Sequence, residues 1–276
     1  MKLGIVGKGG TGKTTLAALI SKAYVDMGRS VVAVDTDSNP NLALNLGLDE
    51  AVADQAPLVP RSLVVGSGGL GSARLLADYG VPTPAGVTLL HAMRVDQAGS
   101  GCACAGHASV RSLLGAALDE EAEVTLVDME AGLEHLSRSG GTLAHADVVL
   151  VVMEPSRKSA LTAARTAALA DELGIPRVAG VGNKARLPDD GAFFEQLSAE
   201  YGVPLVAVVP FDAAVVAADR EGRMLERPSE GVRRAVEEVI SFVNSPQLQH
   251  EALERERQRL ERRLDELAPT GLTQPA

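Results

Sequence analysis

Residues 7–15 read G-K-G-G-T-G-K-T-T, which fits the phosphate-loop pattern G-x-x-x-x-G-K-[ST] at every position. Glycines let successive backbone N–H groups turn inward on phosphate oxygens, because no Cβ restricts their conformation. In this pattern Lys13 adds a positive charge near the β- and γ-phosphates, and Thr14 offers a hydroxyl to Mg²⁺. The stretch therefore predicts a site for nucleotide phosphates. The residues expected to bind the nucleotide here are Gly9, Gly10, Thr11, Gly12, Lys13, Thr14 and Thr15.

The segments on both sides of this loop support the interpretation. Residues 1–6 form a short apolar run typical of a buried strand, and residues 14–27 have the spacing of a helix. The N-terminus of that helix would point at the anion. The inward face predicted for the helix consists of Leu16, Leu19, Ile20 and Ala23. The alternative is a glycine-rich turn that binds no ligand.

Alternating strand and helix signals favour one large α/β domain over two small ones, and the composition argues against several functions. The 276 residues are 46% hydrophobic but only 3% aromatic, with no Trp, so we expect a core of Val, Leu, Ile and Ala. The net charge of −10 argues against nonspecific nucleic-acid binding, which needs clustered Lys and Arg. No apolar run approaches the ~20 residues of a membrane span. Because the chain begins directly with a strand, we expect no signal peptide and a cytoplasmic location.

Two further apolar runs end in acids. Residues 30–34 lead into Asp35 and Asp37, and residues 123–127 lead into Asp128. Ligands of open α/β sheets bind at the carboxyl ends of strands, so these acids should lie beside the phosphate loop. There they could hold the shell of a Mg²⁺ ion or orient an attacking water. Helix caps or turns are the alternative roles for Asp35 and Asp37.

The chain has two cysteines, Cys102 and Cys104, separated by one residue. In a reducing compartment such a pair indicates metal or redox chemistry more than a structural disulfide. Two thiolates make half of a tetrahedral soft-metal site, and a second pair across a two-fold axis would complete it. His107 is a possible additional ligand. A redox pair or two inert thiols remain open on this pattern alone.

The position of Lys8 at the start of the loop is a second feature that resembles a known family. A lysine at the start of K-G-G-x-G-K-T-T, residues 8–15, resembles the deviant phosphate loop of the ParA/MinD/nitrogenase-iron-protein group. In that group this lysine reaches across a dimer interface to the nucleotide of the partner subunit. The resemblance therefore implies a nucleotide-dependent homodimer. An exposed loop lysine is the plainer alternative.

A second resemblance is more specific. Residues 127–135 read V-D-M-E-A-G-L-E-H, and residues 99–104 read G-S-G-C-A-C. Together with the loop they resemble the CooC-type accessory ATPases for nickel insertion into carbon monoxide dehydrogenase, in order from residue 1 to about residue 225. In that family the C-x-C thiols of two subunits bind one metal ion at the dimer interface. The resemblance implies ATP and Mg²⁺ as cofactors, and Ni²⁺ or Zn²⁺ at Cys102 and Cys104.

These resemblances also imply roles for single residues. They assign the attacking water to Asp37 and the outer shell of Mg²⁺ to Asp35, and they add Glu130 to the nucleotide site as part of a second switch. Catalysis is then expected from Lys8, Lys13 and Asp37.

The nucleotide base is expected at the ends of two later strands. Asn183 and Lys184 follow one predicted strand, and Pro210 and Asp212 follow another, at positions that resemble the family's base-contacting segments. The predicted preference for adenine over guanine rests on this resemblance. The guanine motif N-K-x-D is absent, because position 186 is Arg.

The expected fold is α/β: a single doubly wound, mostly parallel sheet with helices on both faces, as in P-loop NTPases of the SIMIBI type. This domain should span residues 1–244, followed by a helical extension over residues 245–276. Further strands are predicted at residues 61–65, 86–91, 147–153, 178–182 and 203–209. Helices are predicted at residues 109–118, at residues 156–173 with Leu161, Ala164, Ala168 and Leu169 inward, and at residues 251–267 with Leu253, Leu260, Leu264 and Leu267 as a thin apolar seam.

Three functions remain open on the sequence. The first is a dimeric Mg-ATPase that loads a metal, nickel by resemblance, onto a client metalloenzyme such as carbon monoxide dehydrogenase. The second is a ParA/MinD-type positioning ATPase that binds DNA or a membrane without metal. The third is an Fe–S cluster carrier that uses the same cysteines. The cysteines and the acidic charge favour the first, with no nucleic-acid partner and no membrane span.

Overall fold

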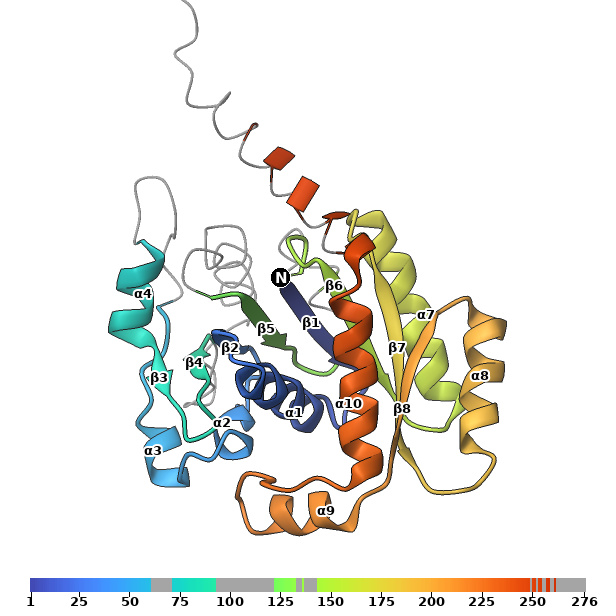
Figure 1. Ribbon diagram of the computed structural model, residues 1–276, viewed down its shortest axis with the longest axis horizontal. Coiled ribbons are helices and arrows are strands. Elements are labelled where there is room, and N and C mark those ends of the chain that lie inside the picture. The colour runs from blue at the N-terminus through green and yellow to red at the C-terminus, as the bar shows by residue number, and fades with distance from the viewer. Residues whose placement is uncertain are drawn as a thin grey trace, which may run out of the picture.

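The computed structural model describes residues 1–60, 71–92, 122–132 and 143–248, residue 136, and residues 250, 251, 253, 254, 257, 258 and 261. In these residues eight strands form one sheet, in the order β3-β4-β2-β5-β1-β6-β7-β8 (Figure 1). The strands are β1 (Lys2–Gly7), β2 (Val31–Asp35), β3 (Val81–Pro82), β4 (Thr88–His91), β5 (Val124–Asp128), β6 (Val148–Met153), β7 (Val178–Ala185) and β8 (Leu205–Pro210). Neighbours pair in parallel except the edge pair β3 and β4, which is antiparallel.

The central strands are continuous apolar runs because both faces of the sheet are covered. Every residue of β1, β2, β5 and β6 is buried. Alternate residues enter two separate cores: Leu3 and Ile5 belong to one, and Val6 belongs to the other. The strands predicted near residues 1–6, 30–34, 86–91, 123–128, 147–153, 178–182 and 203–209 are confirmed, with ends shifted by a few residues.

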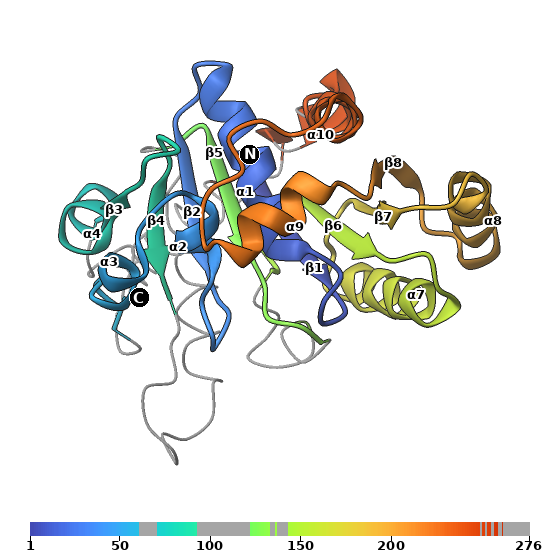
Figure 2. The ribbon, with the colours of Figure 1, turned by 90° about the horizontal axis from the view of Figure 1, so that it is seen from below.

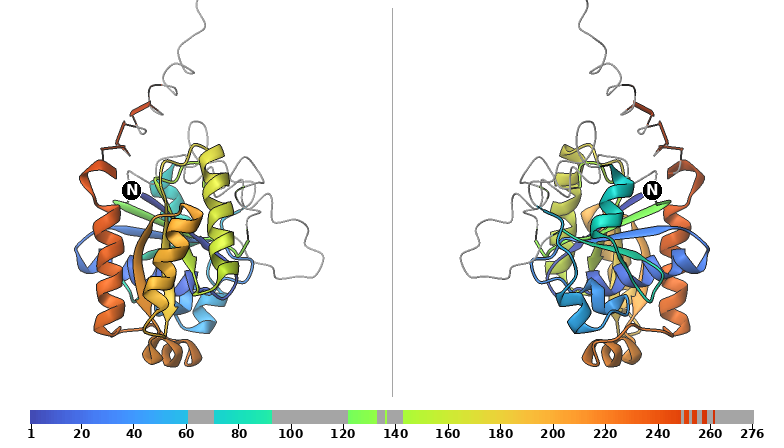
Figure 3. Two further views of the ribbon diagram at one scale, coloured as in Figure 1. Left: turned by 90° about the vertical axis from the view of Figure 1, so that its right-hand side faces the viewer. Right: turned by 90° about the vertical axis from the view of Figure 1, so that its left-hand side faces the viewer.

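Helices cover both faces, so the predicted doubly wound sheet is confirmed. The described helices are α1 (Lys13–Asp26), α2 (Leu42–Asn45), α3 (Glu50–Asp54), α4 (Ser72–Tyr79), α7 (Arg157–Glu172), α8 (Asp190–Tyr201), α9 (Ala213–Arg220) and α10 (Glu230–Val243). Side chains of α1 and α10 belong to one core, and those of α7 and α8 to the other. Figures 2 and 3 show α10 and α7 on opposite sides of the sheet.

The inward face predicted for α7 is confirmed at Leu169, which packs against the core, and is wrong at Leu161 and Ala168. Leu161 is 40% exposed and Ala168 is exposed, whereas Ala160, Ala163 and Ala170 are buried against the sheet. The buried row consists of small residues, which let the helix backbone approach the strands closely. The larger Leu161 is left on the solvent side, one position out of phase with this row.

Part of the C-terminal extension packs on the domain. Beyond α10, Leu248 is buried in the same core as α1 and α10, and Arg177 of the domain pairs with Glu251 at 2.7 Å. Leu253 is exposed. The division into residues 1–244 and 245–276 stays a prediction. The other seam positions Leu260, Leu264 and Leu267, the predicted strand 61–65 and the predicted helix 109–118 lie outside the described residues.

None of the helices described in the structure is long and apolar enough to cross a membrane.

Candidate nucleotide-binding site

The loop between β1 and α1 depends on its glycines. Gly7, Gly10 and Gly12 have φ of 149°, 81° and 93°, a region that side chains disfavour. A Cβ on Gly7 would lie 2.5 Å from the carbonyl oxygen of Val152, and one on Gly12 would lie 2.4 Å from Nδ2 of Asn183. The glycines therefore permit both the turn and the close approach of the neighbouring strands.

Helix α1 begins at Lys13 without a side-chain cap, since its N-cap residue is Gly12. The first N–H groups of such a helix have no partner within it and are suited to an anion. They border a cavity of about 570 Å³. The cavity is lined by the predicted phosphate residues Gly9, Gly10, Gly12, Lys13, Thr14 and Thr15, and also by Asp37, Asn41, Asn45 and Asp219.

Two buried acids lie side by side beneath this cavity. Asp35 ends β2 and Asp128 ends β5, and the two are paired in the register of the sheet. The carboxylate of Asp35 accepts hydrogen bonds from the backbone N–H groups of Asp37, at 3.1 Å, and Leu42, at 3.0 Å. Burial raises the pKa of Asp35 to about 7, although these hydrogen bonds act in the opposite direction.

The pKa of Asp128 is raised as well. Burial, and after it the charge of Asp35, raise the pKa of Asp128 well above its usual value. A hydrogen bond with Thr14 and the charge of Lys13 oppose that rise. The pair therefore favours sharing a proton as long as no cation compensates its charge.

The acids and Thr14 fit a Mg²⁺ ion. Oδ1 of Asp128 is buried and has no hydrogen-bond partner among the described residues. An unpartnered buried carboxylate oxygen is unfavourable, and a hard cation with oxygen ligands, or a water that the cation holds, would satisfy it. The donor set of one hydroxyl and two carboxylates is of the kind that Mg²⁺ prefers.

The segments after β2 and β5 are tied together. The Ser38 hydroxyl donates to Oε1 of Glu130 at 2.8 Å, and the Thr36 hydroxyl donates to the carbonyl of Asp128 at 2.7 Å. Asp37 is half-buried at the rim of the phosphate cavity, where its Oδ1 accepts from the N–H of Asn39 at 2.9 Å. Sequence reasoning missed Thr36 and Ser38, whose partners are more than 90 residues away.

A second cavity of about 180 Å³ adjoins the first, and Gly12 and Lys184 line both. Its walls are mainly apolar and include Leu16, Leu19, Val209, Val215, Val216 and Val232. The predicted base residues Asn183, Lys184, Pro210 and Asp212 all line it. Arg186 also lines this cavity, and its guanidinium lies 3.8 Å from the ring centre of Phe211. The sequence did not suggest a role for Arg186 in the site.

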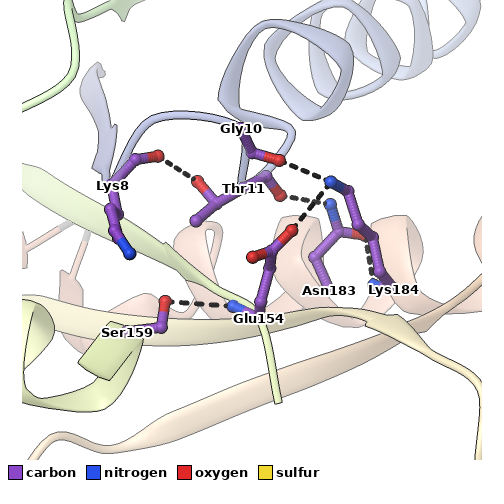
Figure 4. A network of polar contacts seen from close by, with 7 residues as sticks. All are labelled: Lys8, Gly10, Thr11, Glu154, Ser159, Asn183 and Lys184. Carbon is purple, nitrogen blue, oxygen red and sulfur yellow. Dashed lines mark hydrogen bonds and ion pairs between the residues drawn. The ribbon is translucent and has the colours of Figure 1, made fainter. Parts of the chain in front are cut away.

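The predicted base-binding residues also contact the loop itself or a neighbouring helix. Nδ2 of Asn183 donates to the carbonyl of Thr11 at 2.7 Å, and the Lys184 ammonium donates to the carbonyl of Gly10 (Figure 4). The carboxylate of Asp212 accepts from the N–H of Ala214 at 2.8 Å and so caps α9.

The remaining predicted site residues are not brought into this cluster. Lys8 is exposed, and its ammonium bonds to no residue that the structure describes. Cys102 and Cys104 lie outside the described residues. Within the described ranges, no three or more His, Cys, Asp or Glu side chains are grouped to hold a metal ion.

Comparison with known proteins agrees with this geometry. Residues 5–225 match the CobQ/CobB/MinD/ParA nucleotide binding domain. The chain is 35% identical over 237 residues to the carbon monoxide dehydrogenase accessory protein CooC of Rhodospirillum rubrum, a match that covers 80% of this chain and 88% of that protein. It is 31% identical over 257 residues to an uncharacterized ATP-binding protein of Methanocaldococcus jannaschii, with 88% and 97% covered.

Solved structures share the fold. The septum site-determining protein MinD of Pyrococcus horikoshii, complexed with Mg-ADP, superimposes with a TM-score of 0.67 at 22% identity, over 88% of this chain and 96% of that one. Cobyrinic acid a,c-diamide synthase of Mycobacterium smegmatis, with a bound ATP analog and magnesium, gives 0.64 at 22% identity, over 88% and 95%. The chain therefore belongs to the CobQ/CobB/MinD/ParA nucleotide-binding domain family, with CooC among its relatives.

Proposed function

We propose that this chain is a Mg²⁺-dependent ATPase that works as a homodimer and delivers a metal ion, nickel in the first instance, during maturation of a carbon monoxide dehydrogenase-like enzyme. The ATPase is proposed chiefly because Lys13 and Thr14 line the phosphate cavity, and Thr14 hydrogen-bonds with Asp128, which is paired with Asp35 in the register of the sheet. The client is proposed from the relationship to CooC, which is named as an accessory protein of carbon monoxide dehydrogenase.

In the proposed reaction the chain's residues mainly position groups and neutralise charge. The N–H groups of residues 9–15 and the ammonium of Lys13 hold the phosphates, and Asp37 orients the water that attacks the γ-phosphate. Lys8 of each subunit reaches the nucleotide held by its partner. A Mg²⁺ ion held by Thr14, with Asp35 and Asp128 in its outer shell, would neutralise the phosphate charge. Glu130 links this site to the second switch.

The base is proposed to be adenine. The cavity of about 180 Å³ shares Gly12, Thr15 and Lys184 with the lining of the phosphate cavity, so one nucleotide can span the two. Its apolar walls suit the faces of a purine, while Asn183, Lys184, Pro210 and Asp212 supply polar groups at its edge.

The metal is proposed as cargo, bound through Cys102 and Cys104. One chain supplies two thiolates, and a closed soft-metal site takes four ligands, so two chains would share one Ni²⁺ or Zn²⁺ ion. Closure of the dimer on ATP would bring the four thiolates together, and hydrolysis would open it and release the ion.

Phosphate release by the purified chain tests the enzyme. We expect turnover of ATP that requires Mg²⁺, and we expect Asp37→Asn to bind Mg·ATP but to hydrolyse it about 100-fold more slowly, as is typical when a group that assists proton transfer is lost. Size-exclusion chromatography of this variant with ATP should show the closed dimer. If Asp37→Asn turned over ATP at the parental rate, the attacking water would be oriented by another group. If the parent itself showed no turnover, the proposed ATPase activity would be wrong.

A further inference from the structure

The phosphate loop is braced from outside by the ends of β6 and β7. The Lys184 ammonium lies between two acceptors, the carbonyl of Gly10 and, at 2.8 Å, Oε1 of Glu154 (Figure 4). Beside it, Nδ2 of Asn183 donates to the carbonyl of Thr11 at 2.7 Å. Two consecutive loop carbonyls are therefore held by residues that come from other strands.

These contacts fix the direction of the loop's N–H groups. The described peptide bonds are trans, so each carbonyl and the N–H that follows it point in opposite directions. With the Gly10 carbonyl turned to Lys184, the N–H of Thr11 faces the other way and bonds to the carbonyl of Lys8 at 3.3 Å. With the Thr11 carbonyl turned to Asn183, the N–H of Gly12 faces away from Asn183 and stays available to a ligand.

The backbone at Lys184 is strained to make these contacts. Its φ of 61° is the one positive value of a non-glycine residue in the described part of the chain. A left-handed conformation is unfavourable for a residue with a Cβ, and such strain persists where the surroundings enforce it. In this conformation the N–H of Lys184 donates to Oδ1 of Asn183 at 2.9 Å, so the two side chains are oriented together.

Glu154 is itself held in position. It follows β6, and its backbone N–H donates to Oγ of Ser159 at 3.1 Å, in the first turn of α7 (Figure 4). Ser159 is buried, and its N–H is in turn capped by the side chain of Ser156. The backbone of Glu154, whose carboxylate pairs with Lys184, is thus anchored to the N-terminus of a packed helix.

Stability does not account for this pair. The side chains of Lys184 and Glu154 are 39% and 38% exposed, and ion pairs in that setting contribute little to the free energy of unfolding. Electrostatics alone does not account for it either, because a carboxylate near a phosphate site repels the ligand. A carboxylate at this position is explained by what it does to Lys184.

We propose that Glu154 is a positioning residue that orients Lys184 on the Gly10 carbonyl, and so holds the loop in its nucleotide-binding conformation before the nucleotide arrives. The proposal rests on nucleotide binding at this loop and requires neither hydrolysis nor the cysteine metal. It adds to the site a residue that contacts no ligand and acts through Lys184.

Binding of Mg·ADP to three variants, measured by calorimetry, tests the proposal. Glu154→Ala should weaken binding about tenfold, a typical size for the loss of one coupled contact. Lys184→Met keeps the length of the stem and removes the ammonium, so it should weaken binding at least as much. The double variant should be no weaker than Lys184→Met, because Glu154 acts only through Lys184.

Glu200→Ala is the matched control. Glu200 is also 38% exposed and its carboxylate pairs at 2.6 Å with Arg157, so it joins α8 to the first turn of α7 rather than to Lys184. It should leave Mg·ADP binding unchanged, and all variants should keep the parental melting temperature without nucleotide. Amide exchange should quicken in residues 8–12 of Glu154→Ala and not of Glu200→Ala.

The sign of the effect decides between the alternatives. If Glu154 acted only by its charge, Glu154→Ala would bind Mg·ADP more tightly than the parent, and that result would overturn the proposal. Unchanged binding, or equal losses in Glu154→Ala and Glu200→Ala, would overturn it as well. If the parent bound ADP normally in those cases, the proposed function would stand. If the parent bound no nucleotide, both the proposed function and the role of Glu154 would be contradicted.

Discussion

At the scale of single residues, the most informative feature is the buried acid pair. Asp35 and Asp128 lie at the ends of neighbouring strands, and burial raises both pKa values, that of Asp35 to about 7. A raised carboxylate pKa means that the unliganded fold favours the neutral acid. The stability that the protonated carboxyl groups give the fold is therefore present at low pH and is lost as the pH rises through about 7.

The same pair predicts that Mg·ADP binding tightens as the pH rises. A bound cation favours the ionised carboxylates and lowers their pKa, so binding near pH 7 should release a proton. Between pH 6 and 7 the affinity should rise by at most about tenfold for one proton, and it should level off near pH 8. Calorimetry in two buffers with different ionisation enthalpies counts the proton. Asp35→Asn should flatten the profile, and equal affinities of the parent at pH 6 and pH 8 would contradict the assignment.

At the scale of elements, the strands were predictable and the helices only partly so. A parallel strand covered on both faces needs an uninterrupted apolar run, and such runs are visible at β1, β2, β5 and β6. Helices α4, α8, α9 and α10 were not predicted, although α10 has an amphipathic pattern. Its buried residues are Val232, Ala235, Val236, Val239, Ile240 and Val243.

Contacts between elements explain what sequence reasoning could not reach in the site. An acid after an apolar run is a local signal, which is why Asp35 and Asp128 could be named in advance. Glu154 and Lys184 are 30 residues apart in the chain, and they meet because β6 and β7 are neighbours in the sheet. The single sequence has no signal for that adjacency, so Glu154 was missed and Lys184 was expected only at the base.

Helix α10 should contribute to folding in proportion to its buried face. Val239 is fully buried in the core with α1 and β8, so Val239→Ala should lower the free energy of unfolding by about 2 kcal/mol through lost burial and the cavity left behind. Arg234→Ala on the opposite face is the control. That side chain is 78% exposed and pairs with Glu238, so its loss should change stability by less than about 0.5 kcal/mol. Urea unfolding measures both, and equal effects would mean that α10 is not part of the cooperative core.

At the scale of the whole molecule, the described fold builds a nucleotide site and leaves the predicted site residue Lys8 exposed to solvent. Lys8 is exposed at the mouth of the loop and bonds to no residue described in the structure. Such a lysine is available to a second copy of the chain, as the proposed dimer requires. The proposed metal site needs a second chain for a different reason, because each chain has only two cysteines.

The final prediction is that one Ni²⁺ or Zn²⁺ ion binds per two chains. Cys102 and Cys104 are separated by a single residue, and a closed soft-metal site takes four donors, so two such pairs must converge on one ion. Metal alone should therefore promote dimerisation, which native mass spectrometry combined with metal analysis can follow. Because thiolates must lose protons before they bind, the affinity should fall as the pH drops.

The double variant Cys102→Ser, Cys104→Ser separates the metal from the nucleotide. It should lose the metal-promoted dimer and retain Mg·ADP binding, since the cavity beside Lys13 and Thr14 is built from other residues. Anaerobic reconstitution with iron and sulfide provides the competing outcome, because an Fe–S carrier would take up a cluster in preference to a single nickel ion. One metal per chain, or unchanged metal binding by the double variant, would exclude a shared site and leave the two thiols to redox chemistry or to no role in metal transfer.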